Sequence, residues 1–540
     1  MPTDPPSPAR RWALPLLLAL TALAYAGVGQ AGFVWDDEGL ILLNERLRDG
    51  SSPLSFFTTD LWDGTPAGEG VSGYYRPLML LSLYLDRQLF GLSPAGYHLH
   101  SLLWHLLAVF ALAGTLRPRL GAGPALMAAA VFALHPKQSE AVVWVAARND
   151  PMAAALAFSA LWALSGSTVG RRRLLLAAVL ALGAMLAKES VVLLPLLLGL
   201  LDLGSGQRPQ PARYLALGLG IGVGIAMRLL AGVHGAGLPE LSGWMLLARN
   251  GLELLGTWGA DLLIGWPLSA SRSLEWLYQE PPWRVGLGLV GWLLLFWGAL
   301  RRGRLALAGL LWLLLTLLPV LVPIADKGGI GERFTYLPMA GLGIWLAAVL
   351  PERARGLLAL LAVPALLLIH GRLPQWQGDR PLWEHDHAVL GSPYTKTGLA
   401  MTLLRDGEEH RALGLLVEAL DQDPPSREGC DRLVTAAAEL LPPVQAEAAG
   451  RFALSRGCPR TGELAGSLAA TQAGLGQWDR AARTLDGAPL DPMGRDRVVR
   501  AVVARRDGDE AAFAELLAES VDPLELERKV EELLGSSAGP

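Results

Sequence analysis

The chain has 540 residues, of which 52% are hydrophobic and 18% are charged, with a formal net charge of −4 at pH 7. So much apolar sequence excludes an ordinary soluble protein and predicts a polytopic membrane protein, because runs of roughly 17–25 apolar residues can cross a bilayer. Residues 391–540 contain 17 Lys+Arg against 25 Asp+Glu and no basic stripe, which argues against a nucleic-acid partner.

Eleven apolar runs are predicted as membrane spans, and the first begins just after Arg10 and Arg11. A cleaved signal peptide is an alternative for this first run, since Ala24-Tyr25-Ala26 resembles a cleavage site. The apolar run continues past Ala26 and further spans follow, which favours an uncleaved first helix. The predicted spans are 12–29, 97–116, 121–135, 150–166, 174–187, 190–203, 214–233, 285–300, 305–325, 335–350 and 356–371.

Arginines gather at alternate ends of successive runs, which indicates a cytoplasmic N-terminus and a tail outside the membrane. The six clusters are Arg10/Arg11, Arg117/Arg119, Arg171–Arg173, Arg208/Arg213, Arg301/Arg302/Arg304 and Arg353/Arg355. Residues 241–268 are also apolar, but Arg249, Glu253 and Asp261 are costly in hydrocarbon. We expect this segment to lie at the outer surface or in a groove there, without crossing.

Three consecutive acids, Asp36, Asp37 and Glu38, follow the first span within the stretch FVWDDE. Adjacent acids repel, and near a low-dielectric boundary one of them can retain a proton near neutral pH, as general acid–base chemistry requires. The alternative is a solvated helix end.

The other ionisable residues near membrane depth that do not set the topology fall on the same predicted outer face. Each alone is compatible with an interfacial or snorkelling side chain. Together, charges of both signs at one bilayer face predict a site for an anionic, lipid-linked substrate. These residues are Arg76, His135, Glu140, Arg148, Asp150, Lys188, Glu189, Glu332 and Arg333.

The tail changes character, and we predict a junction over 372–390 and a helical domain over 391–540. Gly407 and Gly476 are 69 residues apart and Gly508 follows 32 later, which indicates degenerate tetratricopeptide units of about 34 residues. Plain helical packing without a ligand is the alternative. Cys430 and Cys458 form no zinc-type motif. A disulfide between them is a hypothesis, favoured by an oxidising outer compartment, although neighbouring helices often hold such pairs too far apart.

Several motifs in order resemble the transmembrane and tetratricopeptide-repeat-containing O-mannosyltransferases and their bacterial relatives. The resemblance implies an all-α fold: a polytopic C-type (GT-C) glycosyltransferase domain over 1–371, followed by the repeat domain. The motifs are FVWDDE (33–38), YRPL (75–78), YHLHSLLWH (97–105), HPKQSEAV (135–142), ARND (147–150), KES (188–190) and ERFTYLP (332–338).

The resemblance implies an enzyme of the cytoplasmic membrane that moves a sugar from a polyprenyl-phosphate carrier to a hydroxyl of a protein or glycan. Asp36 and Asp37 are the predicted catalytic acids, with Asp36 as the base; they are also the predicted ligands if a divalent metal is needed. Arg333 is the leading candidate to bind the donor phosphate, because a guanidinium can contact two phosphate oxygens. Lys188 and Arg148 are the next candidates. The predicted supporting residues are Glu38, Arg76, His135, Glu140, Asp150, Glu189 and Glu332.

The repeat domain is the predicted docking place for the acceptor. Two other classes of function remain as alternatives. One is a non-catalytic membrane scaffold that binds periplasmic partners through its repeats, and the other is a transporter. Against a transporter, the sequence shows no acidic or broken-helix site at mid-membrane depth.

Overall fold

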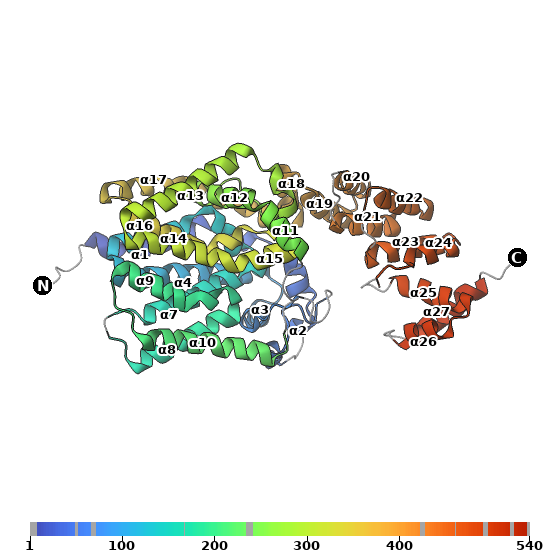
Figure 1. The fold of residues 1–540 in the computed structure, drawn as a ribbon, viewed down its shortest axis with the longest axis horizontal. Coiled ribbons are helices and arrows are strands. Elements are labelled where there is room, and N and C mark those ends of the chain that lie inside the picture. Colours follow the sequence, from blue (N-terminus) through green and yellow to red (C-terminus); the bar gives the residue numbers. More distant parts are fainter. Residues whose placement is uncertain are drawn as a thin grey trace. The chain divides into compact units, whose positions relative to one another are not determined.

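The described part of the chain is mainly helical, and the chain divides into two compact units, Met1–Leu382 and Trp383–Pro540 (Figure 1). The computed structural model describes residues 8–48, 52–65, 72–166, 168–233, 241–421, 427–458, 461–489, 495–518 and 523–536. Within these ranges the strands are β1 (Arg272–Ser273) and β2 (Gly329–Ile330), which form one antiparallel pair. The predicted all-α class is confirmed. The boundary between the units falls inside the predicted junction, where η10 (Leu373–Trp376) and α18 (Asp379–Leu390) lie.

Each predicted span overlaps a helix of the first unit. Within the described ranges, five stretches are long and apolar enough to cross a bilayer: Trp12–Gln30, Pro94–Leu120, Pro211–Leu230, Pro282–Arg302 and Arg304–Lys327. The protein is therefore a membrane protein with several apolar helices, and the number of eleven spans stays a prediction. The overlapping helices are α1 (Pro8–Ala24), α4 (Pro94–Leu120), α5 (Ala122–Leu134), α7 (Asn149–Ala163), α8 (Arg171–Ala187), α9 (Leu194–Ser205), α10 (Pro211–Leu230), α13 (Pro282–Arg302), α14 (Arg304–Leu317), α16 (Tyr336–Val349) and α17 (Glu352–Arg372).

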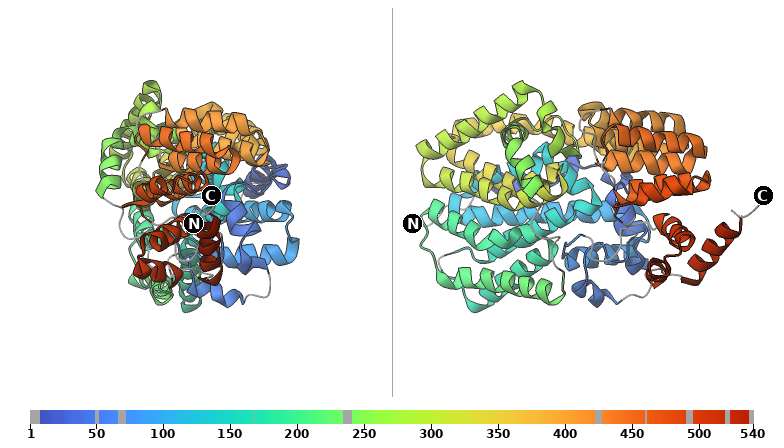
Figure 2. Two further views of the ribbon diagram at one scale, coloured as in Figure 1. Left: turned by 90° about the vertical axis from the view of Figure 1, so that its right-hand side faces the viewer. Right: turned by 45° about the vertical axis from the view of Figure 1, so that its right-hand side comes forward.

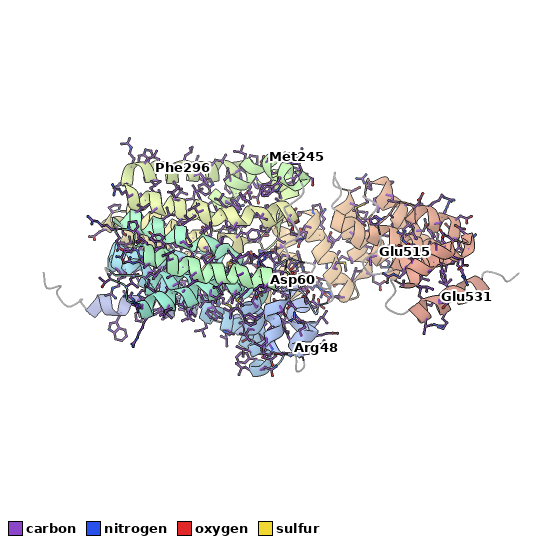
Figure 3. All side chains as sticks on the ribbon, turned by 60° about the horizontal axis from the view of Figure 1, so that its bottom comes forward. Arg48, Asp60, Met245, Phe296, Glu515 and Glu531 are labelled. Carbon is purple, nitrogen blue, oxygen red and sulfur yellow. A yellow bond between two sulfur atoms is a disulfide. The ribbon has the colours of Figure 1, made fainter. Side chains whose placement is uncertain are left out.

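The segment 241–268 forms two short helices, α11 (Leu241–Arg249) and α12 (Gly251–Ile264). At 1.5 Å per residue, even α12 is only about 21 Å long, short of a bilayer core of about 30 Å. α12 packs closely on α13, where a Cβ added at Gly259 would stand 2.2 Å from the Gly288 carbonyl oxygen. Apolar side chains such as Met245 on α11 and Phe296 on α13 project outward (Figure 3).

Three arginines from three of the predicted topogenic clusters meet around the turn that follows α7. Arg119 Nη1 donates to Ser165 Oγ at 2.9 Å, and Arg173 Nη2 donates to the Ser165 carbonyl at 2.5 Å. Arg213 Nη2 donates to the Gly166 carbonyl at 2.5 Å. The chain therefore gathers these cations at one end of the bundle, as alternating spans require. The side chains of Arg10, Arg11, Arg353 and Arg355 lie outside those that the structure describes.

The long loop after α1 is ordered by short helices and polar side chains over its described residues. Asp60, labelled in Figure 3, accepts hydrogen bonds from the Trp62 backbone N–H at 2.9 Å and from Ser72 Oγ at 2.6 Å. These hydrogen bonds tie two separate stretches of the loop together. Its elements are η1 (Val28–Gln30), η2 (Glu38–Leu42), α2 (Glu45–Arg48), η3 (Pro53–Thr58) and α3 (Pro77–Phe90).

The strand pair fixes the segment that carries Arg333. β1 pairs with β2 in the register Arg272 to Ile330 and Ser273 to Gly329. Gly328, with a φ of 71°, ends α15 (Leu321–Lys327) in the left-handed region that favours glycine, so the chain turns directly into β2. η9 (Glu332–Thr335) follows and places Arg333 just before α16.

The second unit consists of helix pairs that pack one after another (Figure 2). The first helices of successive pairs begin at Pro393, Arg427, Gly462 and Arg495, that is 34, 35 and 33 residues apart. This is the period that a tetratricopeptide array requires, and the assignment to that repeat class stays a prediction. The helices are α19 (Pro393–Arg405), α20 (Glu409–Leu420), α21 (Arg427–Leu440), α22 (Pro443–Ser455), α23 (Gly462–Gly474), α24 (Trp478–Leu485), α25 (Arg495–Asp507), α26 (Glu510–Ala518) and α27 (Pro523–Ser536).

Cys430 of α21 and Cys458, just after α22, form a disulfide with a Cα–Cα distance of 5.8 Å. The hypothesis of a bond between them is therefore confirmed by the structure. The two helices are antiparallel neighbours, so the start of one lies beside the end of the other.

Candidate active site

The acidic stretch begins at a strained residue. Trp35 has a φ of 54°, which is rare for a bulky non-glycine side chain. Its ring stacks on Trp144 at 4.7 Å between centroids, and its backbone N–H donates to Asp379 Oδ1 at 2.7 Å. A π-helical turn, η2, follows at Glu38–Leu42. Such strain and π turns gather at functional sites, and here both flank Asp36 and Asp37.

The two neighbouring aspartates occupy different environments. Asp37 is fully buried, and its Oδ1 and Oδ2 accept the backbone N–H groups of Ala146 at 2.7 Å and Val34 at 3.2 Å. Burial, with a smaller contribution from the charge of Asp36, raises the pKa of Asp37 well above its usual range. Asp36 is half-buried and remains at the surface of the site. Asp37 thus ties the loop to η5 (Val145–Ala147), while the Asp36 side chain keeps part of its surface exposed.

Arg333 lies over Trp144, the ring on which Trp35 stacks. Its guanidinium is 4.8 Å from the centre of the Trp144 ring, and its Nη1 pairs with Oε1 of the buried Glu140 from α6 (Ser139–Val143). Burial alone would lower the pKa of Arg333, but Glu140, and after it Asp150 and Asp36, raise it. Nε and Nη2 of Arg333 make no hydrogen bond to any described residue. One edge of the guanidinium fork is therefore open for an anion.

Two further ion pairs complete this group of charges. Lys188 Nζ is 2.6 Å from both oxygens of Asp150, and burial lowers the pKa of this lysine. Arg76 donates through Nε and Nη2 to both oxygens of Glu189 at 3.1 and 2.7 Å. Burial would raise the pKa of Glu189, but the charge of Arg76 overrides it and holds the value at about 2. The donors of Arg76 and the ammonium of Lys188 thus face these acids.

Arg148, a predicted phosphate ligand, points inward. It is fully buried, pairs with Asp86, and donates to Ser82 Oγ, Ser101 Oγ and the Tyr97 carbonyl. All three of its nitrogens therefore have protein acceptors. This arrangement places Arg148 beneath the site, where it joins α3, α4 and α7.

Glu332 and His135 also lie away from the acidic loop, in a second, buried charge network. Glu332 Oε1 accepts Lys137 Nζ at 2.7 Å and the Ser269 backbone N–H at 2.6 Å. His135 joins this network through its ring, whose Nδ1 accepts the Lys137 backbone N–H at 3.4 Å. Lys137 Nζ also lies 3.0 Å from Asp261 of α12. This network anchors the segment 241–268 to the bundle.

Sequence reasoning did not assign several residues that build these networks. Lys137 lies in the motif HPKQSEAV, and Asp261 is an acid in an apolar segment, so the sequence could have indicated a functional or structural role for both. Trp35 stands inside the quoted motif FVWDDE, but Trp144 was not indicated by the sequence, because tryptophan is common at membrane boundaries. Arg272 and Arg284 each form ion pairs with Asp261 and Glu280, and Arg372 pairs with Glu332. The unassigned residues are Trp35, Asp86, Lys137, Trp144, Asp261, Arg272, Glu280, Arg284, Arg372 and Asp379.

The residues at the acidic loop do not form an evident metal site. Within the described ranges, no group of three or more His, Cys, Asp or Glu side chains is arranged to hold a metal ion. Both oxygens of Asp37 are already engaged by backbone N–H groups. We therefore derive no step through a metal.

Part of the chain is similar to known protein O-mannosyl-transferases. It is 38% identical over 192 residues to the Drosophila melanogaster Tmtc1 protein, a match covering 34% of this chain and 22% of that protein. It is 32% identical over 191 residues to human TMTC1, covering 32% and 22%. Mouse TMTC3 is 34% identical over 136 residues, covering 25% and 15%. These matches span about a fifth of the length of these relatives.

The resemblance predicted from the motifs is confirmed over the matched third of the chain. No family model matches the sequence. Among solved structures, the crystal structure of ArnT from Cupriavidus metallidurans in the apo state has 15% sequence identity and a TM-score of 0.39. That match covers 93% of this chain and 81% of ArnT.

Proposed function

We propose that this protein is a glycosyltransferase that moves one sugar from a polyprenyl-phosphate carrier to a hydroxyl group of an acceptor, at the outer face of the membrane. The observation that carries the proposal is that a half-buried acid, Asp36, directly follows Trp35, which stacks on Trp144, and that Arg333, whose fork is open on one edge, lies over the same Trp144 ring. The relatives named protein O-mannosyl-transferases support the same reaction class. By analogy with them, a Ser or Thr hydroxyl of a protein is the acceptor that we favour.

In the proposed reaction, the acceptor oxygen attacks the anomeric carbon while the Asp36 carboxylate takes the hydroxyl proton. The bond between that carbon and the phosphate oxygen breaks, and polyprenyl phosphate leaves with the bonding electrons, so the anomeric configuration inverts. Arg333 Nε and Nη2 contact the phosphate and offset its growing charge. Glu140 holds Nη1 and so fixes the orientation of the fork.

Asp37 and Arg148 position these groups without touching the substrate in this proposal. Asp37 fixes the loop that presents Asp36, and Arg148 supports the loop from beneath through Asp86. Lys188 and Arg76, paired with Asp150 and Glu189, set the local charge balance.

Two features support an orientation with the site and the tail outside the cytoplasm. The arginines that meet near Ser165 gather at one end of the bundle, as cytoplasmic clusters do. The disulfide between Cys430 and Cys458 is typical of an oxidising compartment, which favours an extracytoplasmic tail.

The proposal is tested by incubating the purified protein with a panel of radiolabelled polyprenyl-phosphate sugars and a Ser/Thr-rich acceptor peptide. We expect label to move to the peptide from one donor and to be lost in the Arg333→Ala and Asp36→Asn variants. If no donor in the panel is consumed, while the tail still captures periplasmic proteins and Asp36→Asn has no effect on that capture, the scaffold function replaces the proposal.

A further inference from the structure

The second unit contains a cavity of about 370 Å³ between α22, α23 and α24. This volume lies within the range of roughly 300–1,000 Å³ that is typical of ligand pockets. Arg451 comes from α22, and Arg480 and Arg483 from one face of α24, since residues three apart are neighbours on a helix. The cavity therefore has guanidinium groups on two of its walls.

Glu447, the acid among the described lining residues, cannot neutralise the positive charge of the three arginines. Glu447 is 4% exposed; its Oε1 is 3.0 Å from Arg480 Nη1 and 3.9 Å from Arg451 Nε. Arg483 is exposed and makes no hydrogen bond or ion pair with any described residue. The described lining is thus cationic, although residues 391–540 as a whole carry eight more acids than bases.

The remaining lining fits a peptide better than a lipid phosphate or a nucleic acid. Leu454 and Leu464 provide an apolar surface, and Gln472, which accepts Thr484 Oγ1 at 2.8 Å, provides an amide for a peptide backbone. The acidic tail around the cavity repels extended polyanions and anionic membranes, whereas a short acidic stretch can enter a local cationic pocket.

We propose that this cavity binds a short acidic segment of a polypeptide, with its Asp or Glu carboxylates on Arg480 and Arg483 and an apolar residue on Leu454 and Leu464. We identify this polypeptide as the acceptor protein, an identification that rests on the proposed function. The repeat unit would then select acceptors by an acidic stretch separate from the modified hydroxyl.

The test uses the full-length protein in detergent and a fluorescein-labelled octapeptide of Glu and Leu, with Gln replacing every Glu in the control peptide. We expect anisotropy to show binding of the Glu peptide only. Arg483→Glu, and the double variant with Arg480→Glu, should weaken it roughly tenfold or more, because a charge-assisted contact becomes a repulsion. Arg411→Glu, a charge reversal on α20 outside the cavity, should leave binding unchanged.

Equal binding of the two peptides, or no effect of Arg483→Glu relative to Arg411→Glu, would overturn the inference. So would binding of phosphatidylglycerol vesicles in place of the peptide. Sugar transfer to a short acceptor without an acidic stretch is measured in parallel and should be unchanged in Arg483→Glu. If the wild-type protein transfers sugar from none of the donors in the panel, the proposed function is refuted, while the peptide-binding result still stands.

Discussion

Replacing Asp36 and Asp37 by Asn, one at a time, makes the same chemical change at two neighbouring residues, and we expect different failures. Asp36 is half-buried at the site. In Asp36→Asn the protein should fold and insert normally, while transfer falls by about 10²–10⁴, the usual contribution of a positioned general base. At 1.36 kcal/mol per tenfold change, this is about 3–5 kcal/mol of barrier.

Asp37→Asn should damage the structure as well as the rate. Both carboxylate oxygens of Asp37 accept buried backbone N–H groups, from Ala146 and Val34. An asparagine has a single oxygen, so one of these N–H groups loses its acceptor at a cost of about 1–3 kcal/mol. We therefore expect a lower midpoint of thermal unfolding in this variant and a matching loss of transfer.

The pH dependence of stability gives an independent readout for Asp37. Burial is the main reason that its folded-state pKa lies well above the usual range. Between the two pKa values, the folded protein holds a proton that the unfolded chain has released. This contribution to stability is complete below the unfolded-state pKa of about 3.9 and is lost as pH rises through the folded-state pKa. In Asp37→Asn that slope should disappear.

Transfer and thermal unfolding are measured in the same detergent for both variants and for Glu45→Gln. Glu45 is an exposed carboxylate of α2, and its replacement should change neither quantity. The reasoning is refuted if Asp36→Asn keeps full transfer, or if Asp37→Asn unfolds as the wild type does at every pH.

Three other predictions concern the donor site, the tail and the topology. Arg333→Lys keeps the charge but loses the fork, so the KM for the lipid-linked donor should rise about 10–100-fold; wild-type donor kinetics would contradict this. Cys430→Ser removes the disulfide between two residues that are 28 positions apart in the sequence, and should lower the free energy of unfolding of the tail by about 3–4 kcal/mol. The denaturant midpoint of the tail should fall accordingly, and an unchanged midpoint would contradict this prediction. Alkaline phosphatase fused after residue 275 and after residue 390 should be active at both places, whereas inactivity at 275 with activity after Arg304 would show that 241–268 crosses.

The helical framework could be predicted because it depends on local composition. Each apolar run overlaps a helix, since a segment of this polarity buries its backbone groups by forming one. Arg249, Glu253 and Asp261 made 241–268 unsuitable as a predicted span, and the structure has two short helices there. The period of the tail was visible from its glycines because these end helices in the left-handed conformation, as at Gly407 and Gly476.

The pairings within the site could not be predicted, because they join residues far apart in the chain. Arg333 and Glu140 are 193 residues apart, and Arg76 and Glu189 are 113 apart. The sequence pattern places such residues at one membrane face, but it does not indicate which acid forms an ion pair with which base. Arg148 shows the consequence: its charge suits a phosphate, yet the fold buries it against Asp86.

The division of roles between the two aspartates follows from the backbone. Successive residues of a chain project in different directions, so Asp36 and Asp37 cannot face the same environment. Trp35, held at a φ of 54° by its stacking on Trp144 and its bond to Asp379, sets the direction from which both acids leave the chain. Asp37 accepts the backbone N–H groups of Val34, next to Trp35, and of Ala146, near Trp144. The loop therefore uses one acid to hold the geometry that exposes the other, and a change at Trp35 or Trp144 should act on Asp36 through that geometry.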